Sequence, residues 1–275
     1  MGVGIAYVFA ARGCEVTVVE PDDARTDALR TTVAKVAGDG VRRGRLAPDV
    51  ADGLADSIAR VTSTPDLPEG LDVIIESVPE SLDLKRRVLR EAESRRPALL
   101  ASNTSTLSID RLAESLERPG AFLGMHFFNP VWSLALVEVI RGAATAPDTL
   151  ARALDAVEAI GKQPAVVNDQ PGFATSRLDI VTALEAMRMV EQGVAAPADI
   201  DRAVRLAYRH PVGPLHLSDI VGLDVRLDTA HTLTAALGPR FEPPALLAEM
   251  VARGDLGQKS GRGFYQWDGD SIVDA

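Results

Sequence analysis

Residues 1–168 alternate between apolar positions at helical spacing and short apolar runs that end in polar or proline-containing clusters. The first residues, up to Gly13, carry small and apolar side chains at helical spacing, which predicts a helix ending at the glycine. Short runs rich in Val, Ile and Leu predict buried strands. We expect strands at 15–20, 71–76, 98–102, 121–127, 134–141 and 164–168, with helices at 81–95 and 147–160. Strands separated by helices predict a parallel sheet with crossover connections.

A helical hairpin is predicted between the first two of these strands. Its helices are expected at about 23–37 and 48–61, with a break at Gly38-Asp39-Gly40. A basic patch follows the break and consists of Arg42, Arg43 and Arg45. The pattern alone assigns no role to this patch.

The pattern changes after residue 168, where we place a domain boundary. Only helical periodicity is found from residue 173 to residue 256, and it predicts helices at 178–192, 198–208, 215–237 and 244–253. Residues 169–275 are therefore expected to form an all-α domain, after an α/β domain at residues 1–168. The helices at 178–192 and 215–237 are apolar over more of their circumference than a small domain covers. We therefore predict a homodimer held by the second domain.

Composition and charge narrow the class of protein. The 275 residues suffice for about two domains, and 46% hydrophobic with 25% charged residues is ordinary for a globular protein. With 29 basic and 39 acidic residues the formal net charge is −10, which excludes a generic basic nucleic-acid binder. Cys14 is the single cysteine, and no apolar run reaches the roughly 18 residues of a membrane span. We expect a cytoplasmic protein without membrane contact, nucleic acid or bound metal.

Polar residues that follow the predicted strands are candidates for chemistry, because ligands of a parallel sheet bind at the carboxyl ends of its strands. Glu20 ends a strand behind a glycine-bearing helix, where an acid either accepts hydrogen bonds from an adenosine ribose or is simply solvated. Asn103-Thr104-Ser105 follows another strand and supplies either hydroxyl donors or a helix cap. His126 and Asn129 follow a third strand, and a lone histidine there is more often structural than catalytic.

A carboxylate changes the interpretation of His126. Glu138 lies twelve residues further on in an otherwise apolar run, and a charge buried there is costly unless it is paired. A histidine held by a carboxylate has a fixed tautomer and a raised basicity, which suits it to take a proton from an alcohol. Alcohol oxidation also needs a hydride acceptor, which a dinucleotide site would supply.

Six segments follow one another along the chain and read ASNTSTLSI, GMHFFNPV, LVEVI, DQPGF, HPVGPLHLSDIVGLD and KSGRGFY. In this order, from residue 1 to about residue 267, the chain resembles the bacterial short-chain L-3-hydroxyacyl-CoA dehydrogenase family, especially its 3-hydroxybutyryl-CoA dehydrogenases. The resemblance implies a Rossmann-like domain, NAD as cofactor, and interconversion of a short-chain (S)-3-hydroxyacyl-CoA and its 3-oxoacyl-CoA. Because the Glu20 carboxylate would repel a 2′-phosphate, we expect NAD rather than NADP.

The resemblance also implies roles for individual residues. His126 and Glu138 occupy the positions of the family's catalytic dyad, and Ser105 that of a residue contacting substrate and cofactor. The implied cofactor-binding residues are Gly2, Glu20, Glu80, Lys85, Ser105, Asn129 and Lys259. Lys259 lies in the KSGRGFY turn, where a lysine is otherwise often just solvated. The predicted hairpin resembles an insertion that contacts CoA, so its arginines either meet the CoA phosphates or remain solvated.

Two features depart from the family pattern. Ser176 stands where the family has an asparagine, and we expect its hydroxyl to help hold the thioester or keto oxygen of the substrate. Met1-Gly2 corresponds to the end of the family's G-x-G-x-x-G fingerprint, so the pattern's first strand and first two glycines are missing from the sequence. We therefore expect a Rossmann-like domain that is incomplete at its N-terminus, with translation starting upstream or the chain being a fragment.

Two other interpretations stay open. One is the sugar-acid dehydrogenase branch of the same superfamily, which resembles lambda-crystallin, although HFFNPV followed by LVEVI favours the acyl-CoA branch. The other is a non-catalytic dimeric remnant, which the missing glycines favour and which His126, Glu138 and Ser105 oppose.

Overall fold

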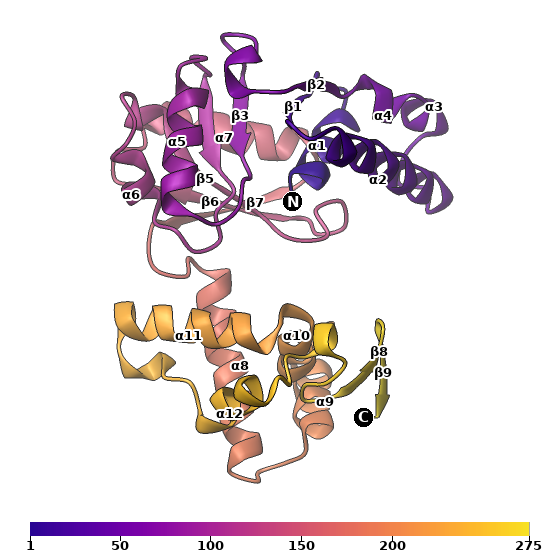
Figure 1. Cartoon of the computed structure of the whole chain (residues 1–275), viewed down its shortest axis with the longest axis vertical. Coiled ribbons are helices and arrows are strands. Elements are labelled where there is room, and N and C mark those ends of the chain that lie inside the picture. Colours follow the sequence, from indigo (N-terminus) through magenta and orange to yellow (C-terminus); the bar gives the residue numbers. More distant parts are fainter. Residues whose placement is uncertain (275) are drawn as a thin grey trace. The chain divides into compact units, whose positions relative to one another are not determined.

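The computed structural model describes residues 1–274, and its internal contacts divide the chain into two compact units, Met1–Gln170 and Pro171–Ala275 (Figure 1). Each unit has its own apolar core. The first unit begins with α1 (Gly2–Ala10), β1 (Thr17–Val19), α2 (Asp23–Arg42), α3 (Pro48–Ala51), α4 (Leu54–Ser57) and β2 (Ala59–Val61). It continues with β3 (Val73–Glu76), α5 (Leu82–Glu93), β4 (Leu99–Ser102), α6 (Ile109–Ala113), β5 (Phe122–Phe127), β6 (Leu136–Arg141), α7 (Pro147–Ala159) and β7 (Gln163–Asn168).

The strands of the first unit form two sheets. β1 pairs in parallel with β2, and a second sheet has the order β3-β4-β5-β6-β7. A doubly wound dinucleotide-binding sheet has the strand order 3-2-1-4-5-6. β2 and β1 match its strands 3 and 2, and β3, β4 and β5 match strands 4 to 6. No described strand fills the position between β1 and β3, which confirms the predicted Rossmann-like domain without its first strand.

The predicted parallel sheet contains one antiparallel pair of strands. β3, β4 and β5 are parallel, but β6 runs antiparallel to β5 before β7 returns parallel to β6. The reason is the connection between β5 and β6, which spans only residues 128–135. A parallel crossover needs a dozen or more residues, so the chain turns back on itself.

Both arms of the predicted helical hairpin differ from the prediction in the structure. α2 does not break at Gly38-Asp39-Gly40 but runs to Arg42, because burial of its apolar face outweighs the roughly 1 kcal/mol helix cost of each glycine. Gly40 also allows a close approach, since a Cβ there would lie 3.2 Å from the Cβ of Leu46. Residues 48–61 form the two short helices α3 and α4 followed by β2, not one helix.

The second unit is helical, with a short hairpin that the sequence did not predict. Its elements are α8 (Thr175–Glu191), α9 (Pro197–Tyr208), α10 (Pro214–Val221), α11 (Leu223–Leu237), α12 (Ala245–Arg253), β8 (Gln266–Asp268) and β9 (Ser271–Asp274). The single helix expected at 215–237 is two helices, α10 and α11. Gly222 separates them with a φ of 104°, a backbone conformation that favours glycine.

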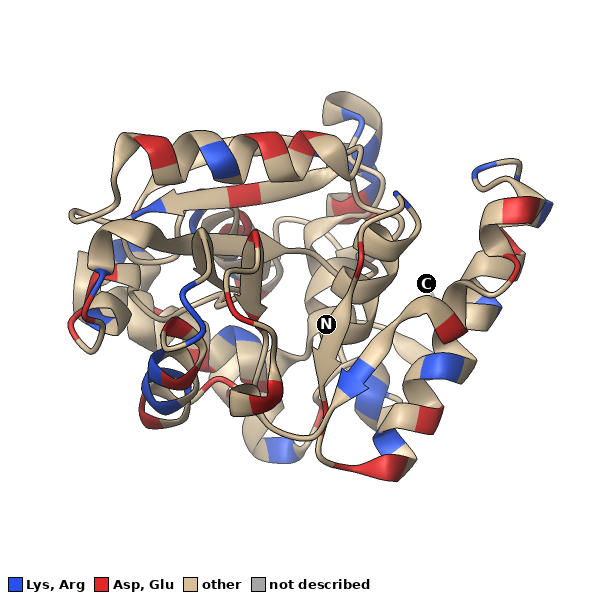
Figure 2. Cartoon of the chain, turned by 90° about the horizontal axis from the view of Figure 1, so that it is seen from above, with Lys and Arg blue, Asp and Glu red and all other residues tan. Residues whose placement is uncertain are grey.

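Charge is distributed over both units. Basic and acidic residues are interspersed along the helices (Figure 2). Several arginines pair with nearby carboxylates, as Arg86 does with Glu114 at 2.6 Å. Within the part of the chain that the structure describes, no helix has the length and apolarity needed to cross a membrane.

Candidate active site

His126 and Glu138 face each other across two neighbouring strands. His126 lies in β5 and Glu138 in β6, and the antiparallel register pairs these two residues directly. Their side chains meet with 2.9 Å between His126 Nδ1 and Glu138 Oε2. Glu138 is fully buried and His126 is 7% exposed. The two residues are twelve positions apart in the sequence because the chain turns back between β5 and β6 and brings them side by side.

This geometry determines how the imidazole is used. When Glu138 is ionised its oxygens only accept hydrogen bonds, so His126 Nδ1 is then the donor and Nε2 is the nitrogen that can exchange a proton. The ring of Phe128 packs at 4.3 Å from the imidazole, between ring centres, and helps to fix its plane. The arrangement can therefore take up a proton at Nε2, while Glu138 stabilises the cation that forms.

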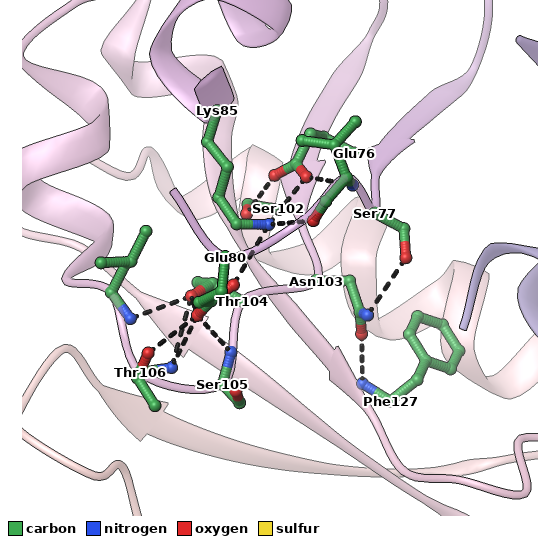
Figure 3. Close-up of polar contacts among 12 residues, drawn as sticks. Glu76, Ser77, Glu80, Lys85, Ser102, Asn103, Thr104, Ser105, Thr106 and Phe127 are labelled. Carbon is green, nitrogen blue, oxygen red and sulfur yellow. Dashed lines mark hydrogen bonds and ion pairs between the residues drawn. The ribbon is translucent and has the colours of Figure 1, made fainter. Parts of the chain in front are cut away.

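Ser105 lies in the turn after β4, and this turn is held by one carboxylate (Figure 3). Glu80 Oε1 accepts hydrogen bonds from the hydroxyls of Thr104 and Thr106 and from the backbone N–H groups of Ser105 and Thr106. Burial by itself raises the pKa of Glu80. Hydrogen bonds from the two threonines and the charge of Lys85 outweigh burial and hold that pKa below its ordinary value.

Asn103 connects this turn to the strand that carries the histidine. Its side-chain oxygen accepts a hydrogen bond of 2.8 Å from the backbone N–H of Phe127, the residue after His126. Its amide nitrogen lies 3.4 Å from the hydroxyl of Ser77, at the end of β3. Asn103 therefore joins the carboxyl ends of β3, β4 and β5 through Ser77 and Phe127, as Figure 3 shows.

Sequence reasoning missed Glu76, which connects the ends of β3 and β4 at this edge. Glu76 ends β3 and is 4% exposed. It accepts a hydrogen bond from Ser102 and forms an ion pair of 2.8 Å with Lys85, which is 1% exposed. An acid at the end of an apolar run was the signal that singled out Glu20, and the same signal in Ile74-Ile75-Glu76 could have identified this residue.

The start of α1 and the end of β1 fit parts of a dinucleotide. α1 begins at Gly2 with no acidic residue in its first turn and no side-chain cap, so its N–H groups suit a phosphate. A Cβ on Gly2 would lie 4.0 Å from the Cβ of Ser77, which places this helix end beside the end of β3. Glu20 follows β1 and is half-buried, with one carboxylate oxygen accepting the N–H of Asp22.

Asn129 lies in the exposed loop 128–135 between β5 and β6. Lys162 holds this loop by donating hydrogen bonds of 2.6 Å to the carbonyls of Val131 and Leu134. Burial lowers the pKa of Lys162. The buried lysine thus holds the backbone of the loop, while the side chain of Trp132 in the same loop is 39% exposed.

Ser176 and Lys259 belong to the second unit. Ser176 is in the first turn of α8, and Lys259 forms an ion pair with Asp224, with 2.5 Å between Nζ and Oδ1. The lysine is therefore not simply solvated, although half of its side chain is exposed. The roles of both residues toward substrate and cofactor stay predictions.

Two further signatures of the second unit have a structural explanation. Asp201 is buried and accepts hydrogen bonds from the first N–H groups of α10, at Leu215 and His216, and from the hydroxyl of Tyr265. Asp219 is fully buried and binds the N–H groups of Phe264 and Tyr265 and the indole of Trp267. Burial raises the pKa of Asp219. The HPVGPLHLSDIVGLD and KSGRGFY segments are thus locked together by two carboxylates.

Comparison with known proteins shows which protein family has this architecture. Residues 1–170 match the model of the 3-hydroxyacyl-CoA dehydrogenase NAD-binding domain, and residues 172–267 match that of the C-terminal domain of the same enzymes. The chain belongs to the 3-hydroxyacyl-CoA dehydrogenase family. A 3-hydroxybutyryl-CoA dehydrogenase of Mycobacterium tuberculosis is 39% identical over 272 residues, which cover 97% of this chain and 95% of that protein. One of Bradyrhizobium diazoefficiens is 35% identical over 278 residues, covering 99% and 94%.

Solved structures agree with this assignment to the family. The crystal structure of (S)-3-hydroxybutyryl-CoA dehydrogenase PaaH1 from Ralstonia eutropha superposes with a TM-score of 0.92 at 37% identity, covering 98% of this chain and 95% of that one. The predicted family, the Rossmann-like domain followed by a helical domain, and NAD as cofactor are confirmed. The residues at α1 and β1 described above fit a dinucleotide of this kind.

Proposed function

We propose that this family member interconverts a short-chain (S)-3-hydroxyacyl-CoA, such as 3-hydroxybutyryl-CoA, and the corresponding 3-oxoacyl-CoA. The observation that carries the proposal is the buried His126–Glu138 pair at the carboxyl end of β5, in a unit of the NAD-binding family. The relatives' names support this substrate class. NAD, when bound, accepts a hydride from the alcohol carbon.

His126 acts as the general base in the oxidation. Its Nε2 takes the proton of the 3-hydroxyl, and Glu138 holds Nδ1 and stabilises the imidazolium. In the reverse direction the imidazolium returns the proton to the 3-oxo oxygen. Ser105, in the turn that Glu80 holds, donates a hydrogen bond to the substrate oxygen. We assign the same kind of contact to Ser176.

We assign Gly2 and Glu20 to the cofactor site, because Gly2 begins α1 and Glu20 follows β1. The N-terminus of α1 would hold the pyrophosphate of NAD, and Glu20 would accept hydrogen bonds from its adenosine ribose. Asn129, Glu80 and Lys259 are carried over from the family's pattern as further cofactor residues. We also propose a cytoplasmic homodimer that associates through the second unit.

A direct assay tests the proposed reaction. The full chain is mixed with NADH and acetoacetyl-CoA, and NADH oxidation is followed by absorbance, with a 3-keto sugar acid as the competing substrate class. We expect turnover of acetoacetyl-CoA and none of the sugar acid. Turnover of the sugar acid alone would support the lambda-crystallin branch. A chain that neither binds NADH nor turns over either substrate would support a non-catalytic remnant.

A further inference from the structure

Arg60 links β2 to the turn that follows β1. β2 pairs in parallel with β1, and the register places Arg60 beside Val18. The ladder continues one residue beyond β1, because the N–H of Glu20 donates to the carbonyl of Val61 at 3.0 Å. Side chains alternate along a strand, so Val18, Glu20 and Arg60 share one face of the paired strands. The side chain of Arg60 therefore extends from the face that also carries the Glu20 carboxylate.

The guanidinium of Arg60 bridges the two ends of this turn, Glu20 and Asp23. Its Nε donates to the carbonyl of Glu20 at 2.7 Å, and its Nη1 lies 2.5 Å from Oδ1 of Asp23, the first residue of α2. The Glu20 carboxylate accepts the N–H of Asp22 at 3.0 Å within the same turn. Arg60 thus holds the backbone that carries the acid we assign to the ribose.

The ion pair between Arg60 and Asp23 holds the guanidinium only weakly. The side chain of Asp23 is 91% exposed and that of Arg60 is 23% exposed, and exposed ion pairs contribute little to stability. Nη2 of Arg60 is buried and has no hydrogen-bond partner among residues 1–274, which is costly for a donor. The guanidinium would therefore gain from a better anion, and a phosphate can bind two of its nitrogens at once.

We propose that Arg60 and Asp23 form a second determinant of cofactor selectivity beside Glu20. Arg60 is a positioning residue that sets Glu20 for the adenosine ribose, and Asp23 retains the guanidinium so that it does not bind a 2′-phosphate. The proposal rests on the ribose site that we assign to Glu20. An arginine near the ribose is the residue by which dinucleotide sites accept the 2′-phosphate of NADP. In this chain the Asp23 carboxylate occupies such an arginine, which favours NAD.

The test measures the Kd for NADH and for NADPH by fluorescence titration of the full chain. The reference is Glu20→Ala, because the Glu20 carboxylate would itself repel a 2′-phosphate. We expect Glu20→Ala/Asp23→Ala to bind NADPH about tenfold more tightly than the reference, the effect of one charge-assisted hydrogen bond. Its Kd for NADH should stay within about threefold of the reference. Adding Arg60→Gln should abolish the gain in NADPH affinity, while Arg60→Lys, which keeps a cation, should retain part of it.

Two controls separate the guanidinium from a general effect of charge. Asp27 is an exposed acid one turn further along α2, so Asp27→Ala in the Glu20→Ala background removes the same charge without releasing Arg60. We expect it to change the Kd for NADPH by less than about twofold. Arg60→Gln in the otherwise unchanged chain tests positioning. It should raise the Kd for NADH about three- to tenfold, because the turn loses its charged donor to the Glu20 carbonyl.

Three results would overturn the proposal. One is an unchanged Kd for NADPH when Asp23→Ala is added to Glu20→Ala. The second is a gain that survives Arg60→Gln or is matched by Asp27→Ala, since charge repulsion alone would then explain it. The third is an unchanged Kd for NADH in Arg60→Gln. Failure of the ribose site looks different, because Glu20→Ala itself would then leave NADH binding unchanged, and none of these titrations depends on turnover of acetoacetyl-CoA.

Discussion

Glu138 fixes which ring nitrogen of His126 carries the proton, and this pair is the residue-scale basis of the proposed chemistry. The sequence already indicated it, because a carboxylate in an apolar run needs a partner and His126 lies twelve residues earlier at the end of an apolar strand. Lys85 is different. Its position on α5 predicted nothing about burial, and only the folded β3–β4 edge reveals the two carboxylates beside it. Glu76 and Glu80 are only nine and five residues before Lys85, but the irregular segment between β3 and α5 that brings them together has no spacing pattern in the sequence.

Glu20 provides a prediction at the same scale. Glu20→Ala should raise the Kd for NADH about 10- to 100-fold, because a charged hydrogen-bond acceptor for the ribose is lost. It should also narrow the preference for NADH over NADPH, since no carboxylate would then repel a 2′-phosphate. Fluorescence titration with both cofactors measures this. Glu15→Ala, an exposed acid before the same strand, is the control, and unchanged affinity and preference in Glu20→Ala would refute the assignment.

At the scale of elements, local pattern predicted most of the first unit and failed where tertiary contacts decide. The strands β3 to β7 and the helices α5 and α7 lie within a few residues of their predicted ranges. The second arm of the predicted hairpin became two short helices and β2, because residues 59–61 pair with β1, a long-range contact invisible to helical periodicity. β6 is antiparallel to β5 because the loop between them is too short for a crossover helix, and we had not used that loop length in the prediction.

The break between α10 and α11 gives a prediction for stability. At Gly222 a side chain would meet a φ of 104° and approach Asp224 Oδ1 to 2.9 Å and Lys259 Nζ to 3.0 Å. Gly254 also has a positive φ, of 83°, but nothing lies within 4 Å of an added Cβ. We expect Gly222→Ala to lower the free energy of unfolding by about 2–3 kcal/mol and Gly254→Ala by about 1–2 kcal/mol. Urea unfolding compares them, and an equal or smaller loss for Gly222→Ala would contradict this explanation of the break.

For the whole molecule, the second unit carries a surplus of exposed apolar side chains. Large hydrophobic residues exposed on it include Leu178, Val194, Leu206, Tyr208, Ile220, Val221 and Val225. Soluble monomers rarely leave large apolar patches in water, and a two-fold pairing would cover the same patch on both copies. The unit also has its own core, so it can be examined separately.

Sedimentation tests the predicted dimer. We expect the full chain and the fragment 169–275 each to sediment as dimers at tens of micromolar, a range chosen around the dissociation constants of weak association. A dimeric full chain with a monomeric, folded fragment would move the interface to the first unit. A monomeric full chain at this concentration would contradict the homodimer.

We propose that His126, held by Glu138, is the acid and base of this NAD-dependent 3-hydroxyacyl-CoA dehydrogenase. The most direct measurement is kcat for NADH-dependent reduction of acetoacetyl-CoA by the wild-type chain and by His126→Gln, with the Kd for NADH measured on both. We expect kcat of His126→Gln to fall by about two to four orders of magnitude, the usual contribution of general acid–base catalysis, and its NADH Kd to stay near the original value. A His126→Gln enzyme that keeps most of its turnover would contradict the claim.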